Sequence, residues 1–221
     1  MVVVAIIATL RNGTRNAYDI LFLFHQEYVT QLEYSNLKKF VANGGTIVFN
    51  DGNIFTVDVN YNSTDDTVKF IRGYTWQYDG KSAAWRGERE RWPNETQQWV
   101  GSNFMQDPTK DNVTFTNNPF SYKHSEEQYV SNPNDKIIFD FGARENESKI
   151  DKVSQNNPNA ANETLAIYEL SYGKGKEIML SIFSYKLGDN KAFLDFCDKE
   201  IIPLAFASAQ NSIRSIAETT Y

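Results

Sequence analysis

Two short polar stretches contain the side chains that could do chemistry in this chain. Each stretch directly follows an apolar run: His25, Gln26 and Glu27 follow residues 19–24, and Asn50, Asp51 and Asn53 follow residues 46–49. A histidine near two carboxylates can act as a general base, as a metal ligand, or as a hydrogen-bonded pair that fixes a loop. His25, Glu27 and Asp51 are therefore the candidate catalytic residues, and a purely structural role stays open beside the chemical one.

A strand, a crossover helix and a second parallel strand are predicted to position these stretches. Both apolar runs are typical of strands buried on both faces of a parallel sheet. Between them, Thr30 and Glu33 form a capping-box pattern, and Asn43-Gly44 supplies the left-handed residue that ends a helix. The residues on the apolar face of this helix are Tyr34, Leu37, Phe40 and Val41. Ligands bind at the carboxyl ends of such strands, so the two polar stretches should face one crevice.

The pattern of the whole chain predicts an α/β fold, a three-layer sandwich with a mainly parallel sheet, in one domain over residues 1–221. The further elements expected are a buried strand at 2–10, a hairpin at 56–61 and 67–72, a strand at 136–141, an antiparallel edge hairpin at 165–172 and 176–183, and a final helix capped by Asp189 or Asn190. Pro203 should kink or break that helix before a second helical stretch at 204–216. Residues 54–133 are expected to form an aromatic-rich insertion of hairpin and loop, mostly loop at 107–133 with at most short strands such as 113–115.

The connection after the first predicted strand limits the topology. Residues 11–17 are too few for a helical crossover between parallel neighbours. The strands at 2–10 and 19–24 therefore either pair antiparallel or are not neighbours.

All four tryptophans lie in the insertion, at Trp76, Trp85, Trp92 and Trp99. Clustered aromatic rings can stack on a sugar or line a pocket, and they can equally form the core of a segment with few aliphatic residues. Both interpretations stay open.

Composition excludes several classes of protein. The formal charge of −6 and the isoelectric point near 5.0 argue against nucleic acid or an anionic membrane as a partner. No apolar stretch approaches the roughly 18 residues of a membrane helix, and residues 2–10 lack the basic flank and cleavage pattern of a signal peptide.

Few residues are available for a nucleophile or for a metal site with several histidines. The only histidines are His25 and His124, and the only cysteine is Cys197, which excludes an internal disulfide. A Cys or Ser flanked by glycines at a strand-to-helix turn is absent. Nucleophilic catalysis is therefore disfavoured, whereas oxygen ligands from Glu27, Asp51 and a tyrosine could hold a metal.

The run F-H-Q-E-Y-V-T at 24–30, the amphipathic helix and G-G-T-I-V-F-N-D-G-N at 44–53 together resemble the glutamine-amidotransferase-like (flavodoxin-like) superfamily. Within it the chain looks most like the carboxy-terminal domain of the N,N-dimethylformamidase large subunit. The end of the chain, residues 165–206, is also similar to trehalose-utilisation-type members. The resemblance implies a mononuclear iron held by tyrosine and glutamate oxygens, with Tyr28 as the residue that matches. Val29 stands where the family tends to have tryptophan.

Six Asn-x-Ser/Thr sequons indicate a glycosylated protein. They lie at Asn12, Asn62, Asn94, Asn112, Asn146 and Asn162, nearly all in segments predicted to be loops or turns. Together with the lack of disulfides, they favour an extracellular or cell-surface protein of prokaryotic, for example archaeal, origin.

Three functions follow from these observations. The leading interpretation is a non-catalytic glycoprotein domain in cell-surface recognition or assembly, with N-linked glycans, a homo-oligomer or surface-protein assembly as partners, and no cofactor. The alternative is a metal-dependent amidohydrolase with iron or zinc near His25, Glu27, Tyr28 and Asp51. The third is a carbohydrate-binding module that uses the four tryptophans.

Overall fold

The computed structural model describes residues 11–12, 15–16, 18–50, 54–55, 57–72, 99–100, 102–106, 127–130, 136–140, 166–180 and 187–209. Several predictions lie outside these described residues: the strand at 2–10, Asp51, Asn53, His124, Trp76, Trp85 and Trp92, and the helical stretch beyond residue 209. None of the helices in the described ranges has the length and apolar character required to span a lipid bilayer.

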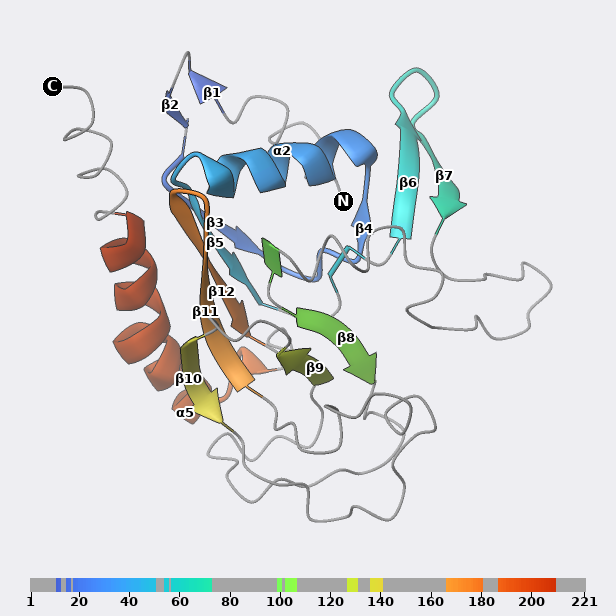
Figure 1. Cartoon of the computed structure of the whole chain (residues 1–221). Coiled ribbons are helices and arrows are strands. Elements are labelled where there is room, and N and C mark those ends of the chain that lie inside the picture. The colour runs from blue at the N-terminus through green and yellow to red at the C-terminus, as the bar shows by residue number, and fades with distance from the viewer. Residues whose placement is uncertain are drawn as a thin grey trace, which may run out of the picture.

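A five-stranded mixed sheet forms the centre of the described structure (Figure 1). Its strands, in spatial order, are β10 (Lys136–Asp140), β11 (Ala166–Tyr172), β12 (Gly175–Leu180), β5 (Thr46–Phe49) and β3 (Ile20–Leu23). The pairs β12–β5 and β5–β3 are parallel, and the pairs β10–β11 and β11–β12 are antiparallel. The predicted α/β class and the antiparallel hairpin near the carboxyl end are thus confirmed, although β10 extends the sheet one strand beyond that hairpin.

Helices cover both faces of this sheet and make it the middle of three layers. Helix α2 (Gln31–Ala42) packs on one face, where it meets Ile47, Phe49 and Met179. Helix α5 (Lys191–Phe196) and the turns after it cover the other face, where Val48 and Ile178 lie. Successive strand residues point to opposite faces, so each strand can serve both cores.

Burial on both faces holds for β5 and not for β3. All four residues of β5 are buried, whereas Phe22 in β3 is 41% exposed. β3 lies at an edge of the described sheet, so it has one neighbour there and less cover.

Both ends of α2 form as the sequence predicts. The Thr30 hydroxyl accepts a hydrogen bond from Glu33 N–H at 3.1 Å, and the Glu33 carboxylate accepts one from Thr30 N–H at 3.4 Å. At the other end Gly44 has a φ of 102°, and the N–H groups of Gly44 and Gly45 donate to the carbonyls of Val41 and Phe40 at 2.9 and 3.0 Å. This is the Schellman arrangement that satisfies the last carbonyls of a helix.

Smaller sheets flank the central one. The predicted hairpin is present as β6 (Val57–Asn62) and β7 (Thr67–Arg72), and β4 (Tyr28–Val29), which the sequence did not predict, pairs parallel with β6. Two further pairs are β1 (Arg11–Asn12) with β2 (Arg15–Asn16), and β8 (Ser102–Gln106) with β9 (Glu127–Val130). A strand as short as β9 is compatible with the prediction of mostly loop with short strands at 107–133, although the sequence did not indicate a strand at this position.

The last helix does not break at Pro203. Asn190 caps α5 by accepting a hydrogen bond from Phe193 N–H at 3.0 Å, and α5 passes into a π-helical turn, η6 (Cys197–Ile201), before helix resumes at 202–209. In this turn Ile202 N–H donates to the carbonyl of Cys197. Proline lacks an N–H and clashes with the carbonyl four residues before it. The wider turn directly before Pro203 is a way to absorb both effects, and π turns of this kind occur inside continuous helices.

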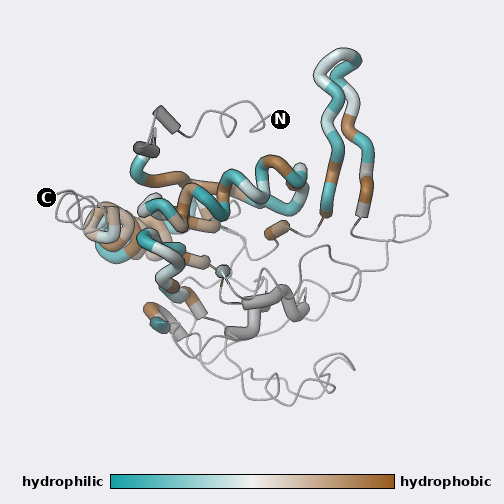
Figure 2. Tube along the Cα trace, turned by 45° about the horizontal axis from the view of Figure 1, so that its top comes forward, coloured by the Kyte–Doolittle hydropathy of each residue, from teal (hydrophilic) through white to brown (hydrophobic). Residues whose placement is uncertain are grey.

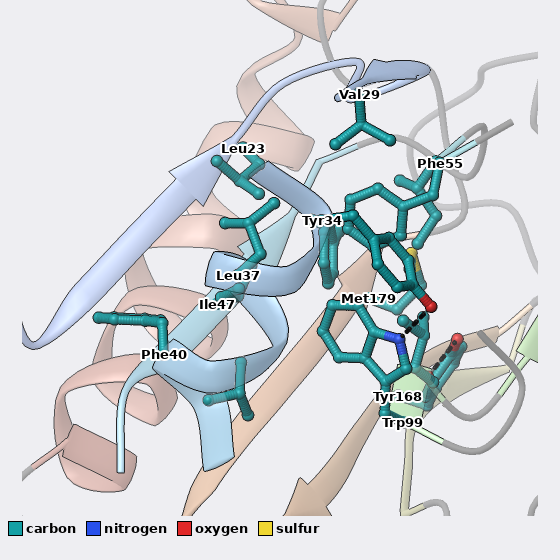
Figure 3. Close-up of a cluster of buried hydrophobic side chains, with 14 residues drawn as sticks. Leu23, Val29, Tyr34, Leu37, Phe40, Ile47, Phe55, Trp99, Tyr168 and Met179 are labelled. Atoms are coloured by element: carbon teal, nitrogen blue, oxygen red, sulfur yellow. Dashed lines mark hydrogen bonds between the residues drawn. The ribbon is translucent and has the colours of Figure 1, made fainter. Parts of the chain in front are cut away.

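Trp99 belongs to the main core and is not available to stack on a sugar (Figure 3). Its side chain is fully buried, its indole Nε1 donates to the Tyr34 hydroxyl at 2.9 Å, and its ring stacks on Phe55 at 5.4 Å between centroids. The expectation of ligand stacking is therefore wrong for Trp99. The ring is buried because α2 and β12 leave an apolar space that a large side chain fills.

Gly175 should be essential for packing the β11–β12 hairpin against the end of α2. A Cβ atom built at Gly175 would collide with the backbone carbonyl oxygens of Val41 and Gly45, which cannot turn aside as a side chain can. We expect Gly175→Ala to lower the free energy of unfolding by about 1–3 kcal/mol or more, measured by urea denaturation.

Gly188→Ala is the matched control for this prediction. Nothing lies within 4 Å of the equivalent Cβ position at Gly188. Its effect on the free energy of unfolding should stay within about 0.5 kcal/mol. Equal effects of the two substitutions would contradict the close approach at Gly175.

Candidate functional site

The loops that follow β3 and β5 meet at one edge of the sheet, as predicted from the strand–helix–strand unit. Asn50 N–H donates to the carbonyl of Leu23 at 2.9 Å. The Asn50 side-chain amide lies 3.4 Å from both the Leu23 and the Val48 carbonyl oxygens. Asn50 therefore holds the two strand ends together, whereas Asp51 and Asn53 lie outside the described residues.

Two residues with a left-handed backbone conformation shape these loops. His25 has a φ of 51° and Phe55 a φ of 54°, a region that residues with a Cβ rarely adopt. The segments around them are joined by backbone hydrogen bonds: Phe55 N–H donates to the Gln26 carbonyl at 2.8 Å, and Val57 N–H to the Glu27 carbonyl at 3.0 Å. Such strain persists only where the surrounding structure fixes it, and it is frequent at functional sites.

The candidate residues His25, Glu27 and Tyr28 gather around one carboxylate, and we call them the Glu27 cluster. The His25 Nε2 atom lies 3.0 Å from Glu27 Oε2. Glu27 is 7% exposed. The pKa of Tyr28 is raised, first by burial and then by the charge of Glu27 and a side-chain hydrogen bond to it. The phenol is thus a hydrogen-bond donor to the carboxylate in the neutral state.

Gln26 lies under this cluster and points inward, a role that the sequence did not predict. Its side-chain amide donates to the carbonyl of Tyr28 and to Glu33 Oε1, both at 3.1 Å. Gln26 is 8% and Glu33 4% exposed. Burial raises the pKa of Glu33, and the hydrogen bonds from Thr30 and Gln26 act in the opposite direction. In the sequence, nothing distinguishes Gln26 from its polar neighbours His25 and Glu27, so its inward orientation could not be predicted.

The single cysteine lies away from this site. Burial, followed by the charge of Asp198, raises the pKa of the Cys197 thiol to about 11. Its reactive thiolate form is therefore scarce at neutral pH.

The donor set of the Glu27 cluster matches part of a metal site. It offers one imidazole nitrogen, one carboxylate and one phenol oxygen. The carboxylate and the phenol are the ligand types in an iron site formed by glutamate and tyrosine. Within the described ranges, no group of three or more His, Cys, Asp or Glu side chains is arranged to hold a metal. A complete set of ligands would need a further residue, and Asp51 is the one that the sequence predicts.

The family model for the carboxy-terminal domain of N,N-dimethylformamidase beta subunit-like proteins matches residues 8–176. The chain belongs to this family. The match includes the whole β3–α2–β5 unit and the Glu27 cluster, so the resemblance noted from F-H-Q-E-Y-V-T is confirmed at this level. A search of curated proteins gives no match.

Among solved structures, the chain is similar to parts of larger enzymes. It aligns with Gan42B, a GH42 beta-galactosidase from G. stearothermophilus, and with its catalytic mutant, in each case at 17% identity over 82% of this chain and 21% of that one, with TM-scores of 0.43 and 0.44. It also aligns with a beta-galactosidase from Bacillus circulans sp. alkalophilus at 13% identity over 83% of this chain and 23% of that one, with a TM-score of 0.40. The chain spans about a fifth of the length of these structures.

The Glu27 carboxylate should control the ionisation of Tyr28. Replacing Glu27 by Gln removes a negative charge and a charged hydrogen-bond acceptor, so the pKa of Tyr28 should fall towards its ordinary value of 10.0. Burial remains in the variant, so the pKa should stay somewhat above that value. Tyrosinate absorbance during an alkaline titration, compared with Tyr28→Phe in the same background, isolates this residue. An unchanged or higher pKa in Glu27→Gln would contradict the contact.

Proposed function

We propose that the Glu27 cluster is the site of a metal-assisted hydrolase that acts on small amides. The observation that supports this most directly is a nearly buried carboxylate in contact with an imidazole and a phenol at the carboxyl end of β3. Ligands of open α/β sheets bind at this edge. Membership of the dimethylformamidase-like family supports an amide as the substrate class. Hydrolysis of this type needs no protein nucleophile, so the missing Cys or Ser elbow does not oppose it.

The proposal includes descent from the glutamine-amidotransferase-like superfamily. Support comes from the β3–α2–β5 unit and from a mixed sheet with α2 on one face and the last helix on the other. The site lies where such folds bind ligands, at the ends of the parallel strands.

The residues of the cluster have separable roles in this proposal. Glu27 and Tyr28 would hold the metal, which would supply a Lewis acid for the amide carbonyl. The His25 side chain is 44% exposed and lies 3.0 Å from Glu27, so it can accept a proton from water while the carboxylate stabilises its charged form. Asp51 is the remaining candidate ligand.

Metal analysis of the natively purified protein tests this function. We expect stoichiometric iron or zinc, and Glu27→Gln or Tyr28→Phe should lose most of the metal and the amidase activity. Tyr61→Phe is the matched control, because Tyr61 also donates to a carboxylate, Asp66, at 2.8 Å but lies at the exposed hairpin. Wild-type protein with neither metal nor activity on small amides would sink the proposal and favour the non-catalytic interpretation.

A second function, a glycoprotein in surface recognition or assembly, is supported by the position of one sequon. Asn62 is exposed at the end of β6, and the turn that follows leads into β7 at the outer end of a hairpin that projects from the rest of the chain (Figures 1 and 2). The backbone N–H of Thr64 donates to Asn62 Oδ1 at 3.0 Å. The side-chain nitrogen, to which a glycan would be attached, has no partner in the described part of the chain.

The other sequons contribute less. Asn12 is the last residue of β1, where it pairs with Arg15 of β2. Asn94, Asn112, Asn146 and Asn162 lie outside the described residues. An extracellular location is part of this second proposal and is compatible with the first.

Intact mass and glycopeptide mapping of protein from its native source test the glycan at Asn62. We expect a mass above the bare 25.3 kDa, reduced by one glycan in Asn62→Gln. Asn60→Gln is the control, because Asn60 is exposed two residues earlier on the same strand and has no sequon. A mass of the bare polypeptide, or no change in Asn62→Gln, would count against this site.

A further inference from the structure

We propose that Gln26 and Glu33 form a positioning bridge that fixes the direction in which Glu27 and Tyr28 face at the carboxyl end of β3. The inference deepens the proposed function, since it assigns positioning residues to the Glu27 cluster. Neither Gln26 nor Glu33 belongs to the cluster itself. Both act through the backbone and the first turn of α2.

The first part of the argument is the geometry at Gln26. The two hydrogen bonds of its amide group reach in two directions, to the carbonyl of Tyr28 within the loop and to Glu33 in α2, both at 3.1 Å. Its side chain is buried, whereas the side chain of His25 beside it is 44% exposed. One buried amide thus joins the loop to the helix directly below the cluster.

Glu33 provides a fixed point for this contact. Its Oε2 accepts from Thr30 N–H at 3.4 Å, while Thr30 Oγ1 accepts from Glu33 N–H at 3.1 Å. The carboxylate therefore lies in the capping box at the helix N-terminus, where the helix dipole favours negative charge. Its second oxygen remains for Gln26. A buried carboxylate held on both oxygens is a rigid acceptor.

The loop needs such a restraint because its backbone is strained at His25, with a φ of 51°. The carbonyls of Gln26 and Glu27 are held by Phe55 and Val57 from the neighbouring segment. The carbonyl of Tyr28 is held by the Gln26 side chain. The pairing of β4 with β6 holds the other side of this segment, so loss of the Gln26 side chain would remove one of two restraints and let the side chains of Glu27 and Tyr28 turn further. Outer residues of this kind commonly change metal affinity about 10–100-fold.

Gln26→Met tests the bridge, because methionine keeps the length and removes both hydrogen bonds. The chain has only two histidines, His25 and His124, so the side-chain NMR signals of His25 can be assigned by comparison with His124→Gln. We expect the His25 imidazole signals of Gln26→Met, at one fixed pH without metal, to move in the same direction as those of Glu27→Gln. We also expect the affinity for added Zn²⁺, measured by calorimetry, to fall about 10–100-fold.

Thr30→Ala is the matched control. It removes the other side chain that bonds with Glu33 and weakens the helix cap, but it leaves the contact between Gln26 and Glu33 in place. Both variants should be less stable than the wild type, and only Gln26→Met should move the His25 signals. Signals that move equally in both variants, or in neither, would overturn the positioning role.

A swapped variant, Gln26→Glu with Glu33→Gln, covers the case in which Gln26→Met does not fold. Glutamine is also suited to this position of a capping box, and the donor and acceptor of the contact between residues 26 and 33 are exchanged, whereas a carboxylate at position 26 cannot donate to the Tyr28 carbonyl. The His25 signals of the swapped variant should lie closer to the wild type than those of Gln26→Glu alone. No such recovery would overturn the positioning role of the contact between Gln26 and Glu33. Absence of Zn²⁺ binding by the wild type would count against the proposed function alone, because the NMR comparison is made without metal.

Discussion

Burial of β5 on both faces is the constraint on which the rest of the described structure depends. Ile47, Val48 and Phe49 are all fully buried, with Val48 facing one core and its two neighbours the other. A strand of this kind needs a paired strand on each side and a helix over each face. β3, β12, α2 and the last helix supply these four partners. What remains accessible is the carboxyl end of the strand, and the polar loops lie there.

An aromatic group connects this core to the candidate site. Tyr34 from α2, Phe55 from the loop after β5 and Trp99 from the insertion pack edge-to-face or stacked, with centroids 5.3 to 5.6 Å apart. Figure 3 shows them on one side of the cluster of buried side chains, with the indole nitrogen directed at the Tyr34 hydroxyl. Phe55 is held in its left-handed conformation by this packing, and its N–H in turn holds the carbonyl of Gln26. Core packing and loop geometry are therefore coupled.

The sequence predicted the elements whose signals are local. The capping box of α2, the glycine that ends it and the four buried residues of β5 all follow from neighbours within about one turn or one strand. The sequence did not predict β4 or β9, because strands of two to four residues depend on their partner more than on their own pattern. The sequence left undecided whether Trp99 lies on a ligand-binding surface or in the core, since an aromatic side chain suits both environments. The π turn at Cys197–Ile201 was missed because it is a property of the packed helix.

The same division applies to the site. His25 and Glu27 were recognised as chemically capable residues, and Tyr28 was indicated by the family resemblance. Their contact occurs with a φ of 51° at His25, and a histidine in the sequence gives no sign of this conformation. Gln26 has no recognisable signal, because its importance comes from Glu33, seven residues away in the sequence and buried beneath it. Local pattern and family resemblance thus identified the candidate side chains, and long-range contacts decided which of them meet.

The two buried glutamates of this region differ in a way that indicates which one is functional. Glu33 is bound to a backbone N–H and to the Gln26 amide, which do not titrate, and it lies in a helix cap. Glu27 is bound to an imidazole and a phenol, which can both exchange protons, and both of these side chains reach solvent. A carboxylate whose partners are neutral and fixed stabilises a fold, whereas one whose partners can change their charge can respond to a ligand. Glu27 is therefore the carboxylate of this region that is suited to chemistry, and Glu33 is the one that keeps it in place.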